Sequence, residues 1–258
     1  MTIYYIHNFN LKNTNIIFFM YESSLITIVF TLAFFFESIM GFGGLLIALS
    51  ILSFFLEIKA LTPVIIYVGF TASMVVLFTD RKTINWSLLI KTIFPISIIG
   101  LLIGVNLFSN ISEAILLKVF AIFLVVVTLK SLIFLKLKLK LKSYFRFPLL
   151  FAGGIAHGLF SIGGPFTLLA VKESFINKNS LRSTMAFYFA FFNLVRFLQL
   201  NYLKKYEFAE FFLMWWLIIP ISLAVLLGYR IHLRIPEDIF KKIINILLLA
   251  AGLIYITK

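Results

Sequence analysis

Glu37 and His157 each lie within a long apolar segment, a few residues before a pair of glycines. Glu37 belongs to the stretch ESIMGFGG, and His157 belongs to HGLFSIGGP. An ionisable residue within an apolar membrane segment points to function by default, and an imidazole titrates near neutral pH. We therefore expect Glu37 and His157 to serve proton coupling or gating. A structural role stays open for each, either a carboxylate hydrogen-bonded to a broken helix end or a neutral imidazole bonded to a backbone carbonyl.

The glycines that follow these two residues predict breaks in the apolar segments. Glycine and proline are poor helix formers, and an unwound turn exposes backbone N–H and C=O groups that lipid cannot satisfy. Such a turn must face protein, water or a ligand, and the positive end of a following half-helix suits an anion. The expected anion-binding residues in the two turns are Gly41, Gly43, Gly44, Ser161, Gly163 and Gly164. The alternative is that these glycines serve only close helix packing.

Composition places these breaks in an all-α polytopic membrane protein. Of 258 residues, 62% are hydrophobic and 13% are charged, whereas soluble domains have about 25% charged residues. Mean hydropathy is +1.08. Each apolar block has at least 19 residues, enough to cross a hydrocarbon core of about 30 Å as a helix. The blocks are 24–56, 60–79, 88–108, 113–135, 147–171, 182–200, 209–229 and 238–257.

The two glycine motifs belong to an internal repeat. An offset of 120 places Gly43-Gly44 on Gly163-Gly164 and Glu37 on His157. Offsets of 125 and 124 place FPIS on IPIS and SEAILLK on PEDIFKK, in the same order along the chain. We therefore predict a first membrane repeat at 1–135, a basic linker at 136–143 and a second repeat at 144–258. Glycine-broken apolar segments at matching places in two halves point to the binding site of a transporter.

Charge and cysteine content exclude several other functions. The net charge of +13 comes from basic residues that cluster between apolar blocks, as in the linker. That placement fits membrane topology and anionic headgroups better than nucleic acid. The chain has no cysteine, which rules out thiolate catalysis and Cys-ligated metals. We expect no metal and no cofactor.

These features together resemble the sulfite exporter TauE/SafE permeases, also called the TSUP family. The resemblance rests on GFGGLLIALSIL at 41–52 and GGIAHGLFSIGGPFTLL at 153–169, with LRSTMAF at 181–187. Leu45 stands where members often have a third glycine. The resemblance implies two halves of four segments, and transport of small anions, mostly sulfur oxyanions and organosulfonates, across a bacterial inner membrane.

The basic residues also predict the topology. If all eight blocks cross the membrane, the 23 Lys and Arg divide 14 to 9 between the two sides. If blocks 24–56 and 147–171 are re-entrant, the division sharpens to 16 and 7. The positive-inside rule then favours re-entrant hairpins, a cytoplasmic linker and periplasmic termini. Each half would have three crossings, so the halves would be inverted relative to each other.

Four further residues are candidates for the substrate path. Arg182 begins an apolar block and is either an interface anchor or an anion contact. Arg196 lies three residues after Asn193, on the same helix face, where it can hold an anion, pair with Glu37 or extend to the interface. Ser73 and Asn193 are related by the offset of 120, and both can line a polar path.

The sequence therefore predicts an inner-membrane permease that moves a small anion by secondary transport, with possible proton coupling. An anion channel remains open, because broken helices also line pores. An intramembrane enzyme or an assembly factor is a further alternative. The chain has no His-Glu-x-x-His pair, Gly-x-Ser-x-Gly elbow or Walker A loop, so the enzyme is not favoured.

Overall fold

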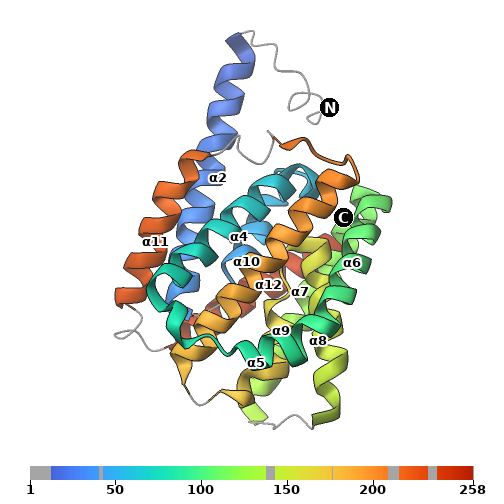
Figure 1. Ribbon diagram of the computed structural model, residues 1–258. Coiled ribbons are helices and arrows are strands. Elements are labelled where there is room, and N and C mark those ends of the chain that lie inside the picture. Colours follow the sequence, from blue (N-terminus) through green and yellow to red (C-terminus); the bar gives the residue numbers. More distant parts are fainter. Residues whose placement is uncertain are drawn as a thin grey trace.

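The computed structural model describes residues 13–40, 43–137, 143–175, 177–208, 215–231 and 237–257, and in these residues all regular structure is helical. Figure 1 shows the helices as one bundle, with the first helix extending beyond it at one end. Gly41 and most of the basic linker lie outside the described residues.

The helices follow the predicted apolar blocks. The first half contains α2 (Asn13–Met40), α3 (Gly44–Leu52), α4 (Ile58–Asp80), α5 (Trp86–Leu88), α6 (Phe94–Asn110) and α7 (Glu113–Leu137). The second contains α8 (Arg146–Phe160), α9 (Gly164–Val171), α10 (Lys178–Tyr202), α11 (Ile218–Ile231) and α12 (Glu237–Thr257). A π-helical segment (Leu89–Ile93) joins α5 to α6 just before Pro95, where a residue without an N–H disturbs regular helix bonding.

Both predicted breaks are present, but their backbone conformations differ. At the first break, Gly43 has a φ of 105°, a conformation that glycine adopts without a steric penalty. At the second break, Ser161 takes the left-handed conformation with a φ of 59°. Gly163 has a φ of −83°, so the positive φ of the second break lies at the serine and not at this glycine.

Each break turns the chain back on itself, so α2–α3 and α8–α9 form two helical hairpins. A Cβ atom at Gly44 would lie 2.9 Å from the Ala33 carbonyl oxygen, and one at Gly153 would lie 3.2 Å from the Gly163 oxygen. The returning helices have 9 and 8 residues. At about 1.5 Å per residue they reach roughly 12–14 Å, less than half of a hydrocarbon core of about 30 Å.

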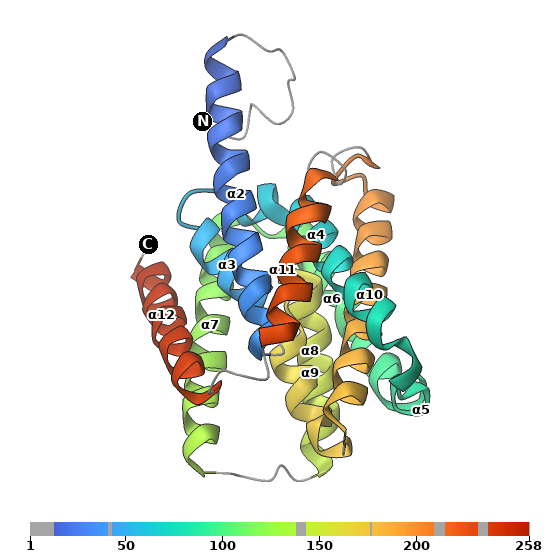
Figure 2. The ribbon, with the colours of Figure 1, turned by 90° about the vertical axis from the view of Figure 1, so that its left-hand side faces the viewer.

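The two halves contact each other through matching pairs of helices. Helix α6 packs on α8, and α11 packs on α2; α4 packs on α10, and α7 packs on α12. In Figure 2, α7 and α12 lie at one side of the bundle and α4, α6 and α10 at the other, with α3, α8 and α9 between them. The two breaks are therefore enclosed by helices from both halves.

Glycines allow the closest of these helix contacts. Gly100 and Gly104 of α6 face the backbone of α8, and Gly154 and Gly158 of α8 face the backbone of α6. Both pairs have the four-residue spacing by which small residues bring membrane helices together. Gly228 of α11 faces the backbone of α2 in the same way.

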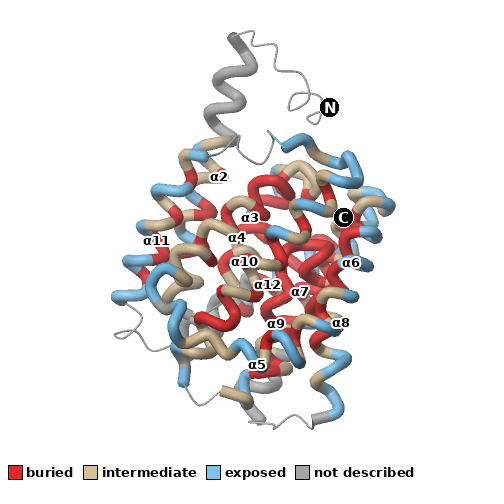
Figure 3. Tube along the Cα trace, in the orientation of Figure 1, coloured by how far each residue is buried: buried red, intermediate tan, exposed pale blue. Residues whose placement is uncertain are grey.

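Apolar side chains cover the outside of the bundle as well as its core. Figure 3 shows the buried residues in the centre and the exposed ones around the periphery. Large apolar side chains such as Phe78 and Ile219 are 76% and 64% exposed, which suits a hydrocarbon environment. Among the described helices, Ile58–Thr79 and Trp86–Asn110 are long and apolar enough to cross a membrane by length and composition.

Candidate functional site

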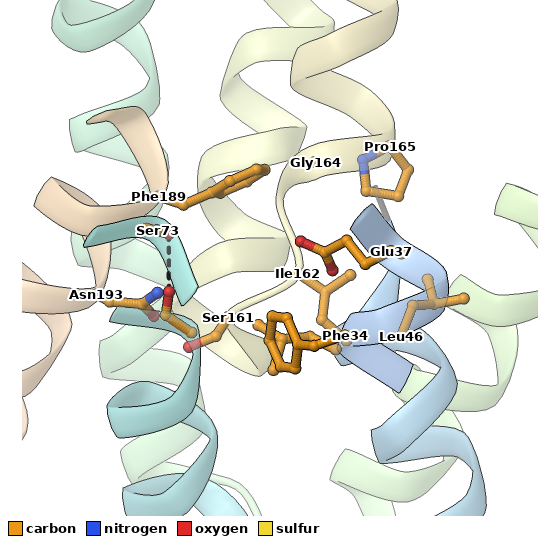
Figure 4. A pocket seen from close by; sticks show the side chains of 13 residues that line it. Phe34, Glu37, Leu46, Ser73, Ser161, Ile162, Gly164, Pro165, Phe189 and Asn193 are labelled. Atoms are coloured by element: carbon orange, nitrogen blue, oxygen red, sulfur yellow. Dashed lines mark hydrogen bonds between the residues drawn. The ribbon is translucent and has the colours of Figure 1, made fainter. Parts of the chain in front are cut away.

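The two breaks meet at a pocket that α4 and α10 complete. Figure 4 shows its side chains. The lining residues are Phe34, Glu37, Gly43, Leu45, Leu46, Gly69, Ser73, Ser161, Ile162, Gly164, Pro165, Phe189 and Asn193. The space open to the centre of a water-sized sphere is about 40 Å³, whereas one ordered water needs about 10–15 Å³ on that measure. The pocket therefore has room for a group of three or four small atoms.

At the first break, the Glu37 carboxylate caps the N-terminus of α3. The Gly44 N–H donates to Glu37 Oε2 at 2.5 Å, and the Leu45 N–H also faces this carboxylate. A negative charge at a helix N-terminus is stabilised by the free N–H groups and the helix dipole. This is the helix-end hydrogen bond that the sequence left open for Glu37. The Gly44 donor, predicted for substrate, is occupied by the protein's own carboxylate.

At the second break, Arg196 of α10 holds the turn in place. Its Nη1 donates to Ser161 Oγ at 2.7 Å, and its Nη2 donates to the Leu159 carbonyl oxygen at 2.8 Å. Its guanidinium carbon also lies 5.0 Å from the centre of the Phe108 ring. The side chain is fully buried, so it does not extend to the interface. Within the described residues it contacts neither Glu37 nor another carboxylate.

The amides of the second turn lack the partner that the first turn has. Within the described part of the chain, the N–H groups of Ile162, Gly163 and Gly164 donate to no other group. Ile162 and Gly164 line the pocket. An unpaired buried N–H is costly, and these groups stand at the positive end of α9. The second turn therefore offers the free donors that the sequence predicted for an anion.

Asn193 brings a further unpaired polar group to the pocket. Its side chain is fully buried, and neither its amide nitrogen nor its oxygen has a hydrogen-bond partner among the described residues. Beside Asn193, Ser73 Oγ donates to the Gly69 carbonyl oxygen at 2.7 Å, the dashed line of Figure 4. Since buried amides are normally hydrogen-bonded, the free Asn193 amide indicates a place for a ligand or water.

His157 lies beside the pocket among aromatic rings. Its ring is fully buried, stacks on Phe189 with centroids 6.1 Å apart, and meets Tyr188 and Phe192 edge-on. The Asn193 amide lies within reach, but neither ring nitrogen forms a hydrogen bond with the described residues. The bond to a backbone carbonyl that the sequence left open is therefore not present.

Arg182 lies near Glu37, beyond the pocket. Its guanidinium carbon is 4.0 Å from the centre of the Tyr229 ring, in a cation–π contact. Its positive charge acts on the Glu37 carboxylate. Arg182 is half-buried, so it is placed between the pocket and the surface.

The structure brings about half of the predicted site residues into the pocket wall. Those that line it are Glu37, Gly43, Ser73, Ser161, Gly164 and Asn193. Those not among the lining residues are Gly44, Gly163, His157, Arg182 and Arg196. Sequence reasoning missed Gly69 and Phe189, although the offset of 120 relates these two positions just as it relates Ser73 and Asn193.

Comparison with known families decides the identity. The family model of the sulfite exporter TauE/SafE matches residues 26–255, nearly the whole chain. The chain belongs to the TauE/SafE family. No curated protein and no solved structure gives a significant match. The resemblance seen in the sequence is confirmed, and TauE/SafE membership makes this chain a membrane protein of a transporter family, which agrees with a function other than catalysis.

Proposed function

We propose that this TauE/SafE protein is a bacterial inner-membrane permease that carries a small sulfur oxyanion or organosulfonate by secondary transport. The observation that carries the proposal is the set of unpaired donors in the pocket between the two breaks. Ile162, Gly164 and Asn193 all line this pocket, and neither the two amides nor the Asn193 side chain has a partner within the described residues. Oxyanion oxygens accept hydrogen bonds from such groups.

The charges around the pocket favour an anion there. The dipole of α9 places a partial positive charge at Gly164. Arg196 adds a full positive charge behind Ser161, and in the described residues no carboxylate balances it. Ser161 thus links the pocket wall to a buried cation, and in a low-dielectric site this attraction is stronger than in water. The volume of about 40 Å³ suits a compact oxyanion head group.

The internal repeat, with halves 1–135 and 144–258, is part of this proposal. Two matching contacts support it. Gly104 of α6 faces Ile155 and Gly158 of α8, while Gly228 of α11 faces Phe35 and Ser38 of α2. The offset of 124 relates the two glycines, and the offset of 120 relates their partners. Equivalent residues therefore make equivalent contacts, as expected for two halves of common design.

The short hairpins support re-entrant segments and hence inverted halves. Helices α3 and α9 are too short to cross the membrane alone, and both start at the pocket. We place the 136–143 linker in the cytoplasm and both termini in the periplasm, as the 16-to-7 charge division favours. The pocket then lies where the two hairpins meet, as in transporters whose site is formed by broken helices.

Flux in proteoliposomes tests the function. Purified protein should transport at least one of sulfite, thiosulfate, sulfonates or carboxylates faster than empty liposomes, and accumulation against a gradient would distinguish a carrier from a channel. Asn193→Leu removes the unpaired amide and should abolish this flux. Asn110→Leu is the matched control, because Asn110 is exposed at the end of α6 and, in the part of the chain that the structure describes, its side chain bonds only to Asn106. Wild-type flux in Asn193→Leu would contradict the proposed site.

A further inference from the structure

The N-termini of α3 and α9 come from equivalent sequence motifs, but only one of them is capped by a carboxylate of the protein. The N-terminus of α3 already holds an anion, because the Glu37 carboxylate accepts the Gly44 N–H at 2.5 Å. At the offset of 120, α8 carries His157 in place of that carboxylate, and its imidazole is turned into the aromatic rings of α10. The donors at the start of α9 are left without a partner in the described residues.

We propose that the pocket contains two anion subsites, one at each half-helix, and that Glu37 fills the first as a tethered anion. A substrate anion then occupies only the second, at Gly164 and Asn193. This inference rests on the proposed function, because it takes the α9 subsite as the place of substrate. Glu37 becomes an affinity-determining residue that fixes the number of bound anions at one per chain.

Hydrogen bonding favours the charged form of Glu37 at this position, while burial of the side chain opposes it. The Gly44 and Leu45 amides face the carboxylate, and amide donors favour the ionised state of a carboxyl group. Arg182 is the positive charge that acts on Glu37 from α10. The described side chains of α3 and α9 include no ionisable group. The C-terminal end of α11, where Gly228 packs beside Phe35 and Ser38, contributes Tyr229 and Arg230. In its charged form, the carboxylate at this place imitates a bound oxyanion.

The tethered charge lowers the affinity of the neighbouring subsite. Two unit charges about 6 Å apart at an effective dielectric constant of about 20 repel each other enough to change Kd roughly a hundredfold. A transporter must release what it binds, and a site that is too tight slows conduction. Glu37 thus caps α3 and keeps a substrate anion exchangeable at α9.

Anion binding to purified protein tests the proposal without any transport measurement. Glu37→Ala empties the α3 subsite, so formate should raise its midpoint of thermal unfolding by more than it raises that of the wild type. Glu57→Ala is the matched control, because Glu57 precedes α4 but its side chain forms no cap hydrogen bond. Titration calorimetry should give one bound sulfite per wild-type chain and two per Glu37→Ala chain. One sulfite in both proteins, or no formate response in Glu37→Ala, would overturn the tethered anion.

A second variant keeps the test decisive if Glu37→Ala does not fold. Glu37→Gln retains an oxygen acceptor for the Gly44 N–H but removes the charge, so sulfite should bind up to roughly a hundredfold more tightly. Unchanged affinity in Glu37→Gln would refute the effect of Glu37 on the second subsite. If neither the wild type nor Glu37→Gln binds any anion of the flux panel, the proposed function itself fails, whereas formate rescue of Glu37→Ala reports on the α3 subsite alone.

Discussion

Gly163→Ala should disrupt the α8–α9 hairpin because the added Cβ has no room. At Gly43 the requirement is different, because the backbone there has a positive φ. A Cβ atom at Gly163 would lie 2.5 Å from the Gly153 carbonyl oxygen, 2.9 Å from Tyr188 Oη and 3.0 Å from His157 Cβ. The nearest of these atoms belongs to the backbone and cannot rotate away. We expect the cost to reach the upper part of the overpacking range, about 3 kcal/mol.

Position 43 provides the comparison. A Cβ there would meet nothing within 4 Å, but the φ of 105° disfavours any residue with a Cβ. Gly43→Ala should cost about 1–2 kcal/mol of backbone strain. Gly43→Asn should cost less, because asparagine adopts left-handed conformations more readily. Gly163→Asn should destabilise the protein at least as much as Gly163→Ala, because the Cβ of either residue would lie too close to the Gly153 carbonyl oxygen.

Thermal unfolding in detergent measures these differences. One kcal/mol shifts Tm by about 2–4 °C in chains of about 150–250 residues, so Gly163→Ala should lose about 6–12 °C. Gly43→Ala should lose about 2–8 °C, and Gly43→Asn should stay near the wild type. A wild-type Tm in Gly163→Ala would show that α8 and α9 do not approach as closely as described. A glycine needed only for contact with a substrate anion would lose transport rather than folding, whereas the Gly153 contact predicts that alanine at Gly163 impairs folding.

Three other predictions concern the site and the topology. Arg196→Lys keeps the charge but cannot reproduce the paired guanidinium hydrogen bonds, so Tm and flux should both fall; an unaltered Tm would contradict the role of Arg196 in the turn. Cysteines at Ser143 and Thr257 should differ toward an impermeant maleimide on intact cells, and labelling at Ser143 alone would reverse the proposed orientation. If Glu37 and His157 couple protons, Glu37→Gln and His157→Asn should flatten the pH dependence of flux, and two unchanged pH profiles would end that hypothesis.

The positions of the two breaks could be predicted from glycines, but the role of each glycine could not. Gly43 is needed because its φ is positive, and Gly163 is needed because the Gly153 backbone leaves no room for a side chain. In the sequence, both are glycines at the same place of two similar motifs. Whether a glycine is required for its φ or for lack of space depends on the residues packed beside it, and the local sequence does not show these residues. The left-handed conformation of Ser161 carried no signal in the sequence, because serine rarely adopts it.

The polar side chains show the same division. Helical periodicity placed Asn193 and Arg196 on one face of α10, and the offset of 120 paired Asn193 with Ser73. Neither pattern could show that Arg196 bonds to Ser161 and leaves the pocket wall to Asn193. Glu37 was recognised as a candidate helix cap, but the capping hydrogen bond could be seen only from the position of Gly44.

The glycine contacts between α6 and α8 determine which parts of the molecule can move as one body. Their backbones touch around Gly100, Gly104, Gly154 and Gly158, and Ser97 Oγ donates across the contact to the Leu150 carbonyl oxygen at 3.0 Å. Such a contact resists sliding, because no flexible side chain separates the two helices. The hairpin of the second half is thereby attached to a helix of the first half, and α11 attaches the first hairpin to the second half. In a rocking motion, α6 should move with the second hairpin and α11 with the first, so the moving bodies would not coincide with the division of the chain into 1–135 and 144–258.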